Sequence, residues 1–164
     1  MAARRLYRTI VVTGEPRGRF FQGPIDGALR PGIVVQIKAA TEKVSGNFTF
    51  TPYNVASDGS RPHGPIMVLC EAQMRGGTID TAYVDGELGL VYCPIPGDEL
   101  LCMLADVAGT DTDTHAIGDP YMIDDGTGEL LAPSSEECQP FVGLETLSTG
   151  LAADTLTHVM FSGY

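Results

Sequence analysis

The sequence predicts a mainly β protein, a compact β-barrel or sandwich of short strands with an extended N-terminal arm. Its 164 residues include 20 glycines and 11 prolines but no tryptophan, and this excess of turn formers is typical of many short strands. Eight to ten apolar runs of strand length alternate with Gly, Pro and Asp turn signals. No long segment has a helical period, so we expect at most one short helix, near residues 98–106.

The first half of the chain is predicted to supply four strands. Residues 9–12, Thr-Ile-Val-Val, are rich in β-branched side chains, which favour extended backbone. Residues 33–38 follow a tight turn at Pro31-Gly32 and form the next apolar run. The alternating run 47–51 is predicted to be an edge strand, and the continuous apolar run 66–72 a buried strand.

The second half repeats short apolar runs that are separated by glycine-acid turns. The segment Asp124-Asp125-Gly126-Thr127-Gly128 is predicted to be a hairpin turn. Residues 99–105 are good helix formers that also fit a fully buried strand, so both structures stay open for this segment. The predicted strands are residues 88–93, 121–123, 129–131, 141–146 and 156–161.

Every lysine and arginine of the chain lies in its first 75 residues. Residues 1–75 hold 10 basic and 5 acidic residues, whereas residues 76–164 hold 16 acidic residues and no basic one. This split indicates an arm that reaches for an acidic partner, while an acidic body faces water. Segregation of surface charge by chance or for solubility is the alternative. The basic cluster at the front consists of Arg4, Arg5, Arg8, Arg17 and Arg19.

The chain is expected to form one domain with an arm. We divide it into a basic N-terminal arm at residues 1–22 and an acidic β-domain at residues 23–164, with a polar surface excursion at about 41–65. No apolar run approaches the roughly 20 residues that span a bilayer. The N-terminus also lacks the uninterrupted apolar core of a secretory signal. We therefore expect a soluble protein that is made in the cytoplasm and has no membrane partner.

Motifs of common enzyme and metal sites are missing from the sequence. It contains no G-x-S-x-G, P-loop, G-x-G-x-x-G or H-E-x-x-H motif. Its four cysteines form no C-x-x-C pair and are predicted to be reduced core thiols. The acidic loop Asp111–His115 lacks the glycine and distal glutamate of an EF-hand loop. We predict no catalytic residue, no cofactor and no metal; a hydrolase built from a Cys–His pair that meets in space is the alternative.

Nucleic acid is a possible partner for an arginine-rich arm, because arginines neutralise phosphates. The 16 uncompensated acidic residues of the second half would repel a polyanion at close approach. Aromatic residues are not interleaved with the arginines, so the arm offers no stacking platform for bases. We therefore predict no direct contact with nucleic acid, and an acidic protein surface as the partner of the arm.

A succession of turn-and-strand signatures resembles the capsid decoration (cement) proteins of tailed bacteriophages. The resemblance rests on the order of these signatures and spans roughly residues 23–161. The long excursion at 41–65 and the basic arm depart from a minimal member of that family. The signatures are Leu29–Gly32, Val91–Leu100, Ile117–Pro120, Gly128–Leu130 and Val142–Glu145.

Decoration proteins are small β-rich proteins outside the phage shell, usually trimers over junctions between major capsid subunits. The resemblance implies a non-enzymatic virion protein on the outer capsid surface, a homotrimer that clamps adjacent subunits of the major capsid protein. Another virion β-barrel, from the tail or the head-completion machinery, is the alternative. The residues expected to bind the capsid are Arg4, Arg5, Arg8, Thr9, Ile10, Val11, Val12, Arg17 and Arg19.

Within this arm, two interpretations of residues 9–12 stay open. The run could add a strand to a sheet edge of the capsid, or it could be the first strand of the chain's own sheet. On the first interpretation, deletion of residues 1–22 leaves a folded protein that no longer binds shells.

Overall fold

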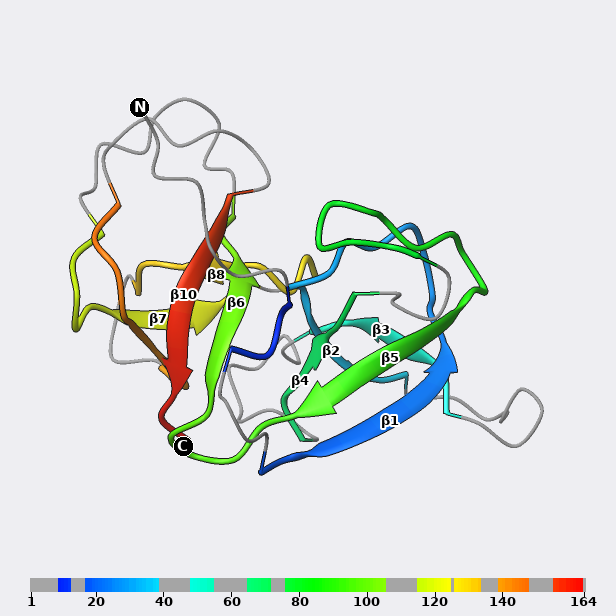
Figure 1. Ribbon diagram of the computed structural model, residues 1–164, viewed down its shortest axis with the longest axis horizontal. Helices are drawn as coiled ribbons and strands as arrows, with labels where there is room; N and C mark the ends of the chain where they lie inside the picture. Colours follow the sequence, from blue (N-terminus) through cyan, green and yellow to red (C-terminus); the bar gives the residue numbers. More distant parts are fainter. Residues whose placement is uncertain are drawn as a thin grey trace.

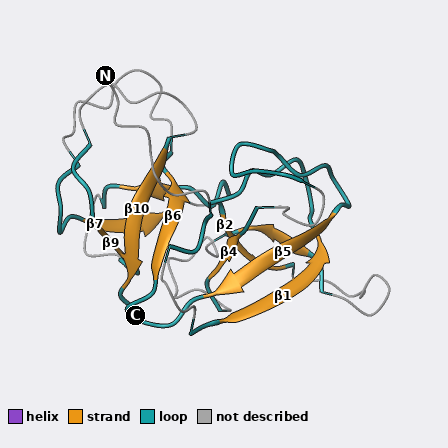
Figure 2. Cartoon of the chain, in the orientation of Figure 1, coloured by secondary structure: helices purple, strands orange, loops and turns teal. Residues whose placement is uncertain are grey.

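The computed structural model describes residues 9–12, 17–38, 48–54, 65–71, 76–105, 115–124, 126–133, 139–147 and 155–163. Within these residues the chain forms ten strands and no helix, so the mainly β prediction is confirmed (Figure 2). The ambiguous segment 99–105 contains a strand, because its apolar residues are buried on both faces. No helix that could cross a membrane occurs in the described part of the chain.

The strands form two antiparallel five-stranded sheets, which lie beside each other as two lobes (Figure 1). The first sheet has the order β1-β5-β4-β2-β3, and the second has the order β6-β10-β9-β7-β8. The strands of the first sheet are β1 (Arg19–Pro24), β2 (Val34–Ile37), β3 (Phe50–Pro52), β4 (Met67–Leu69) and β5 (Leu88–Cys93). Those of the second sheet are β6 (Glu99–Met103), β7 (Pro120–Ile123), β8 (Leu130–Leu131), β9 (Phe141–Gly143) and β10 (Leu156–Phe161).

Each sheet curls until its two edge strands approach each other. In the first sheet a parallel bridge joins Ile25, directly after β1, to Phe50 of β3, and the Asp26 amide donates to the Phe50 carbonyl at 2.8 Å. In the second sheet the equivalent bridge joins Leu104, directly after β6, to Leu130 of β8. Curling of this kind shortens the exposed edges that endanger small β-domains.

The two sheets are structural repeats of one unit. When the strands of each sheet are numbered in chain order, both sheets have the order 1-5-4-2-3. The register agrees residue by residue, since Val68 lies opposite Tyr92 in the first sheet as Val142 lies opposite Met160 in the second. We call residues 19–93 repeat 1 and residues 99–161 repeat 2.

Hydrogen bonds outside the strand ladders follow the same equivalence. The Cys70 amide donates to the Leu90 carbonyl at 2.8 Å, and the Leu144 amide donates to the His158 carbonyl at 2.8 Å. Both repeats also turn into their second strand through a glycine with positive φ, Gly32 at 92° and Gly118 at 94°. Only glycine adopts that conformation without strain, so these two positions are constrained in the same way.

Backbone hydrogen bonds also join the two repeats directly. The Met103 amide of β6 donates to the Gly32 carbonyl at 3.0 Å, and the Val34 amide of β2 donates to the Gly128 carbonyl at 2.7 Å. A Cβ atom on Gly128 would lie 2.1 Å from the Val34 carbonyl oxygen, so this approach requires glycine. A single buried apolar cluster includes residues of both sheets. The repeats therefore pack as one body.

Strand β1 lies across the predicted boundary between arm and domain. The sequence predicts an arm over residues 1–22, yet β1 begins at Arg19 and pairs with β5 over its full length, from Arg19 opposite Cys93 to Pro24 opposite Leu88. The last part of the predicted arm is therefore an edge strand of repeat 1. The polar excursion at 41–65 includes β3 and residues that lie outside the described part of the chain.

Candidate binding surface

The residues predicted to bind a partner fall into three groups. Arg4, Arg5 and Arg8 lie outside the described residues. Thr9–Val12 lie beside β6, and they form the dark blue segment between the two lobes in Figure 1. Arg17 and Arg19 lie at the start of β1, at the rim of repeat 1. The structure thus places the described residues of the predicted arm at two sites.

Thr9–Val12 pair with the chain's own second repeat. An antiparallel bridge joins Val11 to Leu100, and the Leu101 amide donates to the Ile10 carbonyl at 2.8 Å. The Ile10 side chain has 0% exposure and belongs to the core. These contacts favour the interpretation in which the run pairs within the chain's own fold, although it forms an isolated bridge and not a strand.

The same run is also tied to repeat 1. The Ile10 amide donates to the buried Glu71 carboxylate at 2.9 Å, and Glu71 lies two residues after the end of β4. The Thr9 hydroxyl donates to the Val11 carbonyl at 2.8 Å. These backbone groups would have to leave their present partners before they could pair with a strand of another protein.

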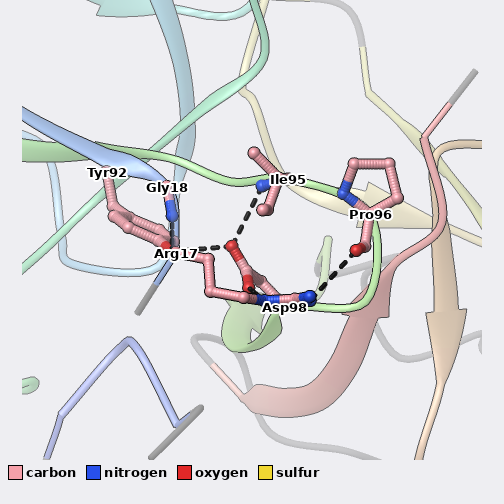
Figure 3. Close-up of polar contacts among 6 residues, drawn as sticks. All are labelled: Arg17, Gly18, Tyr92, Ile95, Pro96 and Asp98. Atoms are coloured by element: carbon pink, nitrogen blue, oxygen red, sulfur yellow. Dashed lines mark hydrogen bonds and ion pairs between the residues drawn. The ribbon is translucent and has the colours of Figure 1, made fainter. Parts of the chain in front are cut away.

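A buried carboxylate, Asp98, anchors the residues that lead into β1 (Figure 3). Its Oδ2 atom accepts a 2.6 Å hydrogen bond from the Tyr92 hydroxyl and a 2.9 Å bond from the Ile95 amide. Its Oδ1 atom lies 3.5 Å from Nε of Arg17. The buried charge is therefore compensated by an ion pair and two donors.

Two further contacts complete this Asp98 cluster. The Gly18 amide donates to the Tyr92 hydroxyl oxygen at 2.7 Å, and the Arg17 guanidinium donates to the Pro96 carbonyl at 3.2 Å. Burial, followed by the hydrogen bond to Asp98, raises the pKa of Tyr92 to about 12, so its hydroxyl stays a donor at neutral pH. The Arg17 side chain is held at one end but remains 55% exposed.

Strand β1 presents two aromatic side chains to solvent. Phe20 is 47% exposed and Phe21 is 41% exposed, and Arg19 beside them is exposed as well. The ring centroids of Phe20 and Tyr92 lie 4.8 Å apart, and this contact links the strand to the Asp98 cluster. In the sheet order β1 is an edge strand, and Figure 1 places it at the rim of its lobe. We call Arg17, Arg19, Phe20 and Phe21 the β1 surface.

The strand periodicity of the sequence does not single out Phe20 and Phe21. The run Arg-Phe-Phe-Gln has no period-two alternation, and a glycine and a proline follow it. Two adjacent aromatic residues next to arginines were the available signal, because aromatic and arginine side chains are enriched at protein interfaces. That signal carries weight only once the strand is known to lie at an edge.

A cysteine hydrolase would need a cysteine that is activated by a histidine. The described cysteines and histidines lie in different surroundings. Burial raises the pKa of the Cys70 and Cys102 thiols, and it also raises that of Cys93. A nucleophilic cysteine needs a lowered pKa. His115 stacks on Tyr121 with ring centroids 5.6 Å apart, and Nε2 of His158 lies 3.0 Å from Oε2 of Glu99.

Acidic side chains do not gather into a metal site in the described part of the chain. No group of three or more His, Cys, Asp or Glu side chains that could hold a metal ion occurs there. In the candidate loop Asp111–His115, only His115 belongs to the described residues. Cys138 also lies outside them.

Comparison with known proteins gives a likeness in fold. No protein-family model and no curated protein matches the sequence. Among solved structures, the chain is similar to the N base of the head fibre protein gp8.5 of bacteriophage phi29. The TM-score is 0.52 at 8% sequence identity, and the match covers 88% of this chain and 94% of that chain. The two proteins share a fold over nearly their whole lengths.

Proposed function

We propose that this protein is a structural component of a phage virion and binds the outside of the capsid. The observation that carries the proposal is the likeness in fold to the base of a phage head fibre, over 88% of the chain. The order of sequence signatures resembles capsid decoration proteins and points to the same place in the virion. Because a fold alone does not fix a function, the binding surface carries the rest of the argument.

The partner we propose is the major capsid protein. The β1 surface offers two exposed aromatic side chains beside Arg17 and Arg19, and the basic residues Arg4, Arg5 and Arg8 precede it in sequence. Residues 99–161 carry 12 acidic and no basic residues, so repeat 2 suits contact with water. The protein would therefore face the shell with repeat 1 and solvent with repeat 2.

The proposed clamping of adjacent capsid subunits depends on the rigidity of the protein and on the presence of several copies of it in one oligomer. Backbone hydrogen bonds such as Val34 to Gly128, at 2.7 Å, hold the two repeats as one body that resists shear. A homotrimer of such bodies would contact several subunits at once, and weak single contacts would then sum to high avidity. We propose this trimeric clamp as the mode of action.

A non-enzymatic role agrees with the chemistry of the described thiols. Burial raises the pKa of Cys70, Cys102 and Cys93, which disfavours the thiolate that a cysteine hydrolase requires. Thiol labelling of the native protein tests this point. We expect Cys70 and Cys102 to react only after unfolding, and rapid labelling of either would favour the hydrolase.

Co-sedimentation with DNA-free shells of the phage tests the proposed function. We expect the full chain to saturate the shells, and bound shells to resist heating better than bare ones. Isolated tails are the matched control and should not bind the protein. Mass measurement in solution tests the trimer separately. Absence of binding to shells, or binding to tails alone, would overturn the proposal.

A further inference from the structure

The two repeats meet through unlike faces. Repeat 1 contributes the start of β2, where the Gly32 carbonyl accepts from the Met103 amide at 3.0 Å and the Val34 amide donates to the Gly128 carbonyl at 2.7 Å. We call this surface the turn face. Repeat 2 contributes the end of β6 and the residues before β8, which we call the edge face. Each repeat has both faces, so repeat 1 keeps a spare edge face and repeat 2 a spare turn face. Contacts between unlike faces continue into open chains unless something stops them.

The spare edge face of repeat 1 lacks an amide that the junction uses. Pro24 lies opposite Leu88 in repeat 1 as Met103 lies opposite Leu156 in repeat 2, so Pro24 is the equivalent of Met103. The Met103 amide donates across the junction. Proline has no amide hydrogen, so the spare edge face cannot form the equivalent bond.

The spare turn face of repeat 2 lacks the other amide. Val34 lies opposite Val68 as Pro120 lies opposite Val142, and these two partners are equivalent residues of β4 and β9. Pro120 is therefore the equivalent of Val34, whose amide donates across the junction. Proline thus stands at both of these donor positions, one on either spare face.

A phenylalanine occupies the position where the junction requires glycine. The bridges that close the two sheets make Phe50 the equivalent of Leu130, so Phe48 is the equivalent of Gly128. A Cβ atom on Gly128 would already lie 2.1 Å from the Val34 carbonyl oxygen. Phe48 carries a whole ring at this place and is 45% exposed. A second copy that approached as the repeats approach each other would collide with this ring.

An acidic residue replaces an apolar one beside Pro120. Ile33 directly precedes Val34 and is 8% exposed, and its Cγ2 atom would lie 2.9 Å from a Cβ atom on Gly128. Its equivalent is Asp119, whose carboxylate accepts a 2.6 Å hydrogen bond from an amide of its own turn. Burial of a carboxylate in an apolar contact is costly, so Asp119 adds to the mismatch.

Both spare faces are open to solvent within one chain. A Cβ atom on Gly32 would lie 2.5 Å from Cδ2 of Leu156, whereas a Cβ atom on the equivalent Gly118 would have no described atom within 4 Å. Leu156 is 7% exposed, but its equivalent Leu88 is 45% exposed, and Ile117 beside Gly118 is 67% exposed. The spare faces therefore keep apolar side chains of the kind that invite association.

We propose that Pro24, Phe48 and Pro120 terminate the two-repeat array, so that copies of this protein do not join head to tail into chains. Each of the three replaces a residue that the junction between the repeats needs, and terminal units of repeat arrays carry such changes. The proposal is independent of the proposed function. It also means that the proposed trimer is not a ring in which the junction recurs between copies, and that its contacts lie elsewhere.

Two variants that copy the junction residues onto the spare faces test the proposal. The edge variant carries Pro24→Met and Phe48→Gly, and the turn variant carries Asp119→Ile and Pro120→Val. Sedimentation velocity of the natural protein should give one constant mass over about a hundredfold range of concentration. Each variant alone should keep that mass, because its restored face still meets a blocked one.

The combinations of the variants should associate. We expect an equimolar mixture of edge and turn variants to form one-to-one complexes, so that the average mass rises by up to about twofold. A chain with all four substitutions has both faces restored and should form an open series whose average mass grows with concentration. If a double variant proves unfolded by circular dichroism, its single form, Phe48→Gly or Pro120→Val, takes its place.

Three outcomes would overturn the proposal. The first is a folded four-substitution chain that keeps the natural mass, together with a mixture that does not associate. The second is an open series formed by the natural protein itself. The third is association of the edge or turn variant alone to the same extent as the four-substitution chain, which would indicate a general gain in adhesion. Binding to shells enters none of these outcomes, so the proposed function stands or fails separately.

Discussion

The Tyr92 hydroxyl donates a 2.6 Å hydrogen bond to the buried carboxylate of Asp98, and this pair links the end of β5 to the start of β6. The two residues are six positions apart, on either side of the turn that connects the repeats. Arg17 completes the group from the segment before β1. The connection between the repeats is thus held by a polar cluster at its centre.

Replacement of Asp98 should lower the free energy of unfolding more than replacement of its hydrogen-bond partner Tyr92. Asp98→Ala leaves the Tyr92 hydroxyl and the Ile95 amide without their acceptor, and we expect a loss of about 2–4 kcal/mol in the free energy of unfolding. Tyr92→Phe removes one hydrogen bond and should cost about 1–2 kcal/mol. Urea unfolding of both variants and of the double variant measures the coupling. Losses that simply add would show that the pair does not act as a unit.

Stability should fall in alkaline solution before general denaturation sets in. Burial raises the pKa of Tyr83 and of Tyr92 to about 12, from an ordinary value of 10.0. Above pH 10 the unfolded chain loses these protons while the folded chain still holds them, so the free energy of unfolding declines as the pH rises toward about 12. Urea midpoints across that range measure the slope.

The matched variant for this prediction is Tyr92→Phe. It should show a shallower decline than the natural protein between about pH 10 and pH 12, because one of the two raised phenols is gone. An equal slope in both proteins would assign the decline to other groups.

Glycine at position 128 is predicted to be irreplaceable at the junction of the repeats. A Cβ atom there would meet the Val34 carbonyl oxygen at 2.1 Å, and the residue has a φ of 72°. Gly126 has a φ of 86°, but a Cβ atom there would have no neighbouring atom within 4 Å. We expect Gly126→Ala to cost about 1 kcal/mol through backbone strain alone, and Gly128→Ala to cost about 3 kcal/mol or more. Thermal and urea unfolding of the pair isolates the effect of the close approach.

Truncations should separate the basic residues at the front from the fold. Deletion of residues 1–8 removes Arg4, Arg5 and Arg8 and leaves every described contact, so this variant should fold and should bind shells more weakly. Deletion of residues 1–22 removes the buried Ile10 and most of β1, so the expectation of a folded product is replaced by one of unfolding. Circular dichroism distinguishes the two. A cooperative native melt for the longer deletion would show that β1 is dispensable.

The sequence predicted individual strands better than it predicted their arrangement. Residues 33–38, which follow the turn at Pro31-Gly32, and residues 156–161 are apolar runs, and both contain strands. Strand β1 was missed because its first four residues are exposed, so it lacks the pattern that burial imposes.

The internal repeat was also invisible in the sequence. Equivalent positions share backbone hydrogen bonds rather than side chains. The Leu69 carbonyl accepts a hydrogen bond from the Gly32 amide, and the equivalent Gly143 carbonyl accepts one from the Gly118 amide. The Asp98 cluster joins residues from two distant segments, so no local spacing in the sequence predicts it. The arginines at the front were visible from charge alone, but their positions depended on tertiary structure.

The strand order also sets an order of assembly during synthesis. In each repeat the first strand pairs with the last, so neither sheet can be completed until its final strand has left the ribosome. Repeat 1 can close once Cys93 is available, before most of repeat 2 exists. The bridge at Val11 must wait longer than the hydrogen bond from Ile10 to Glu71, because its partner Leu100 belongs to the later unit. One of the earliest parts of the chain to be made thus gains its full set of contacts only after the first repeat is complete.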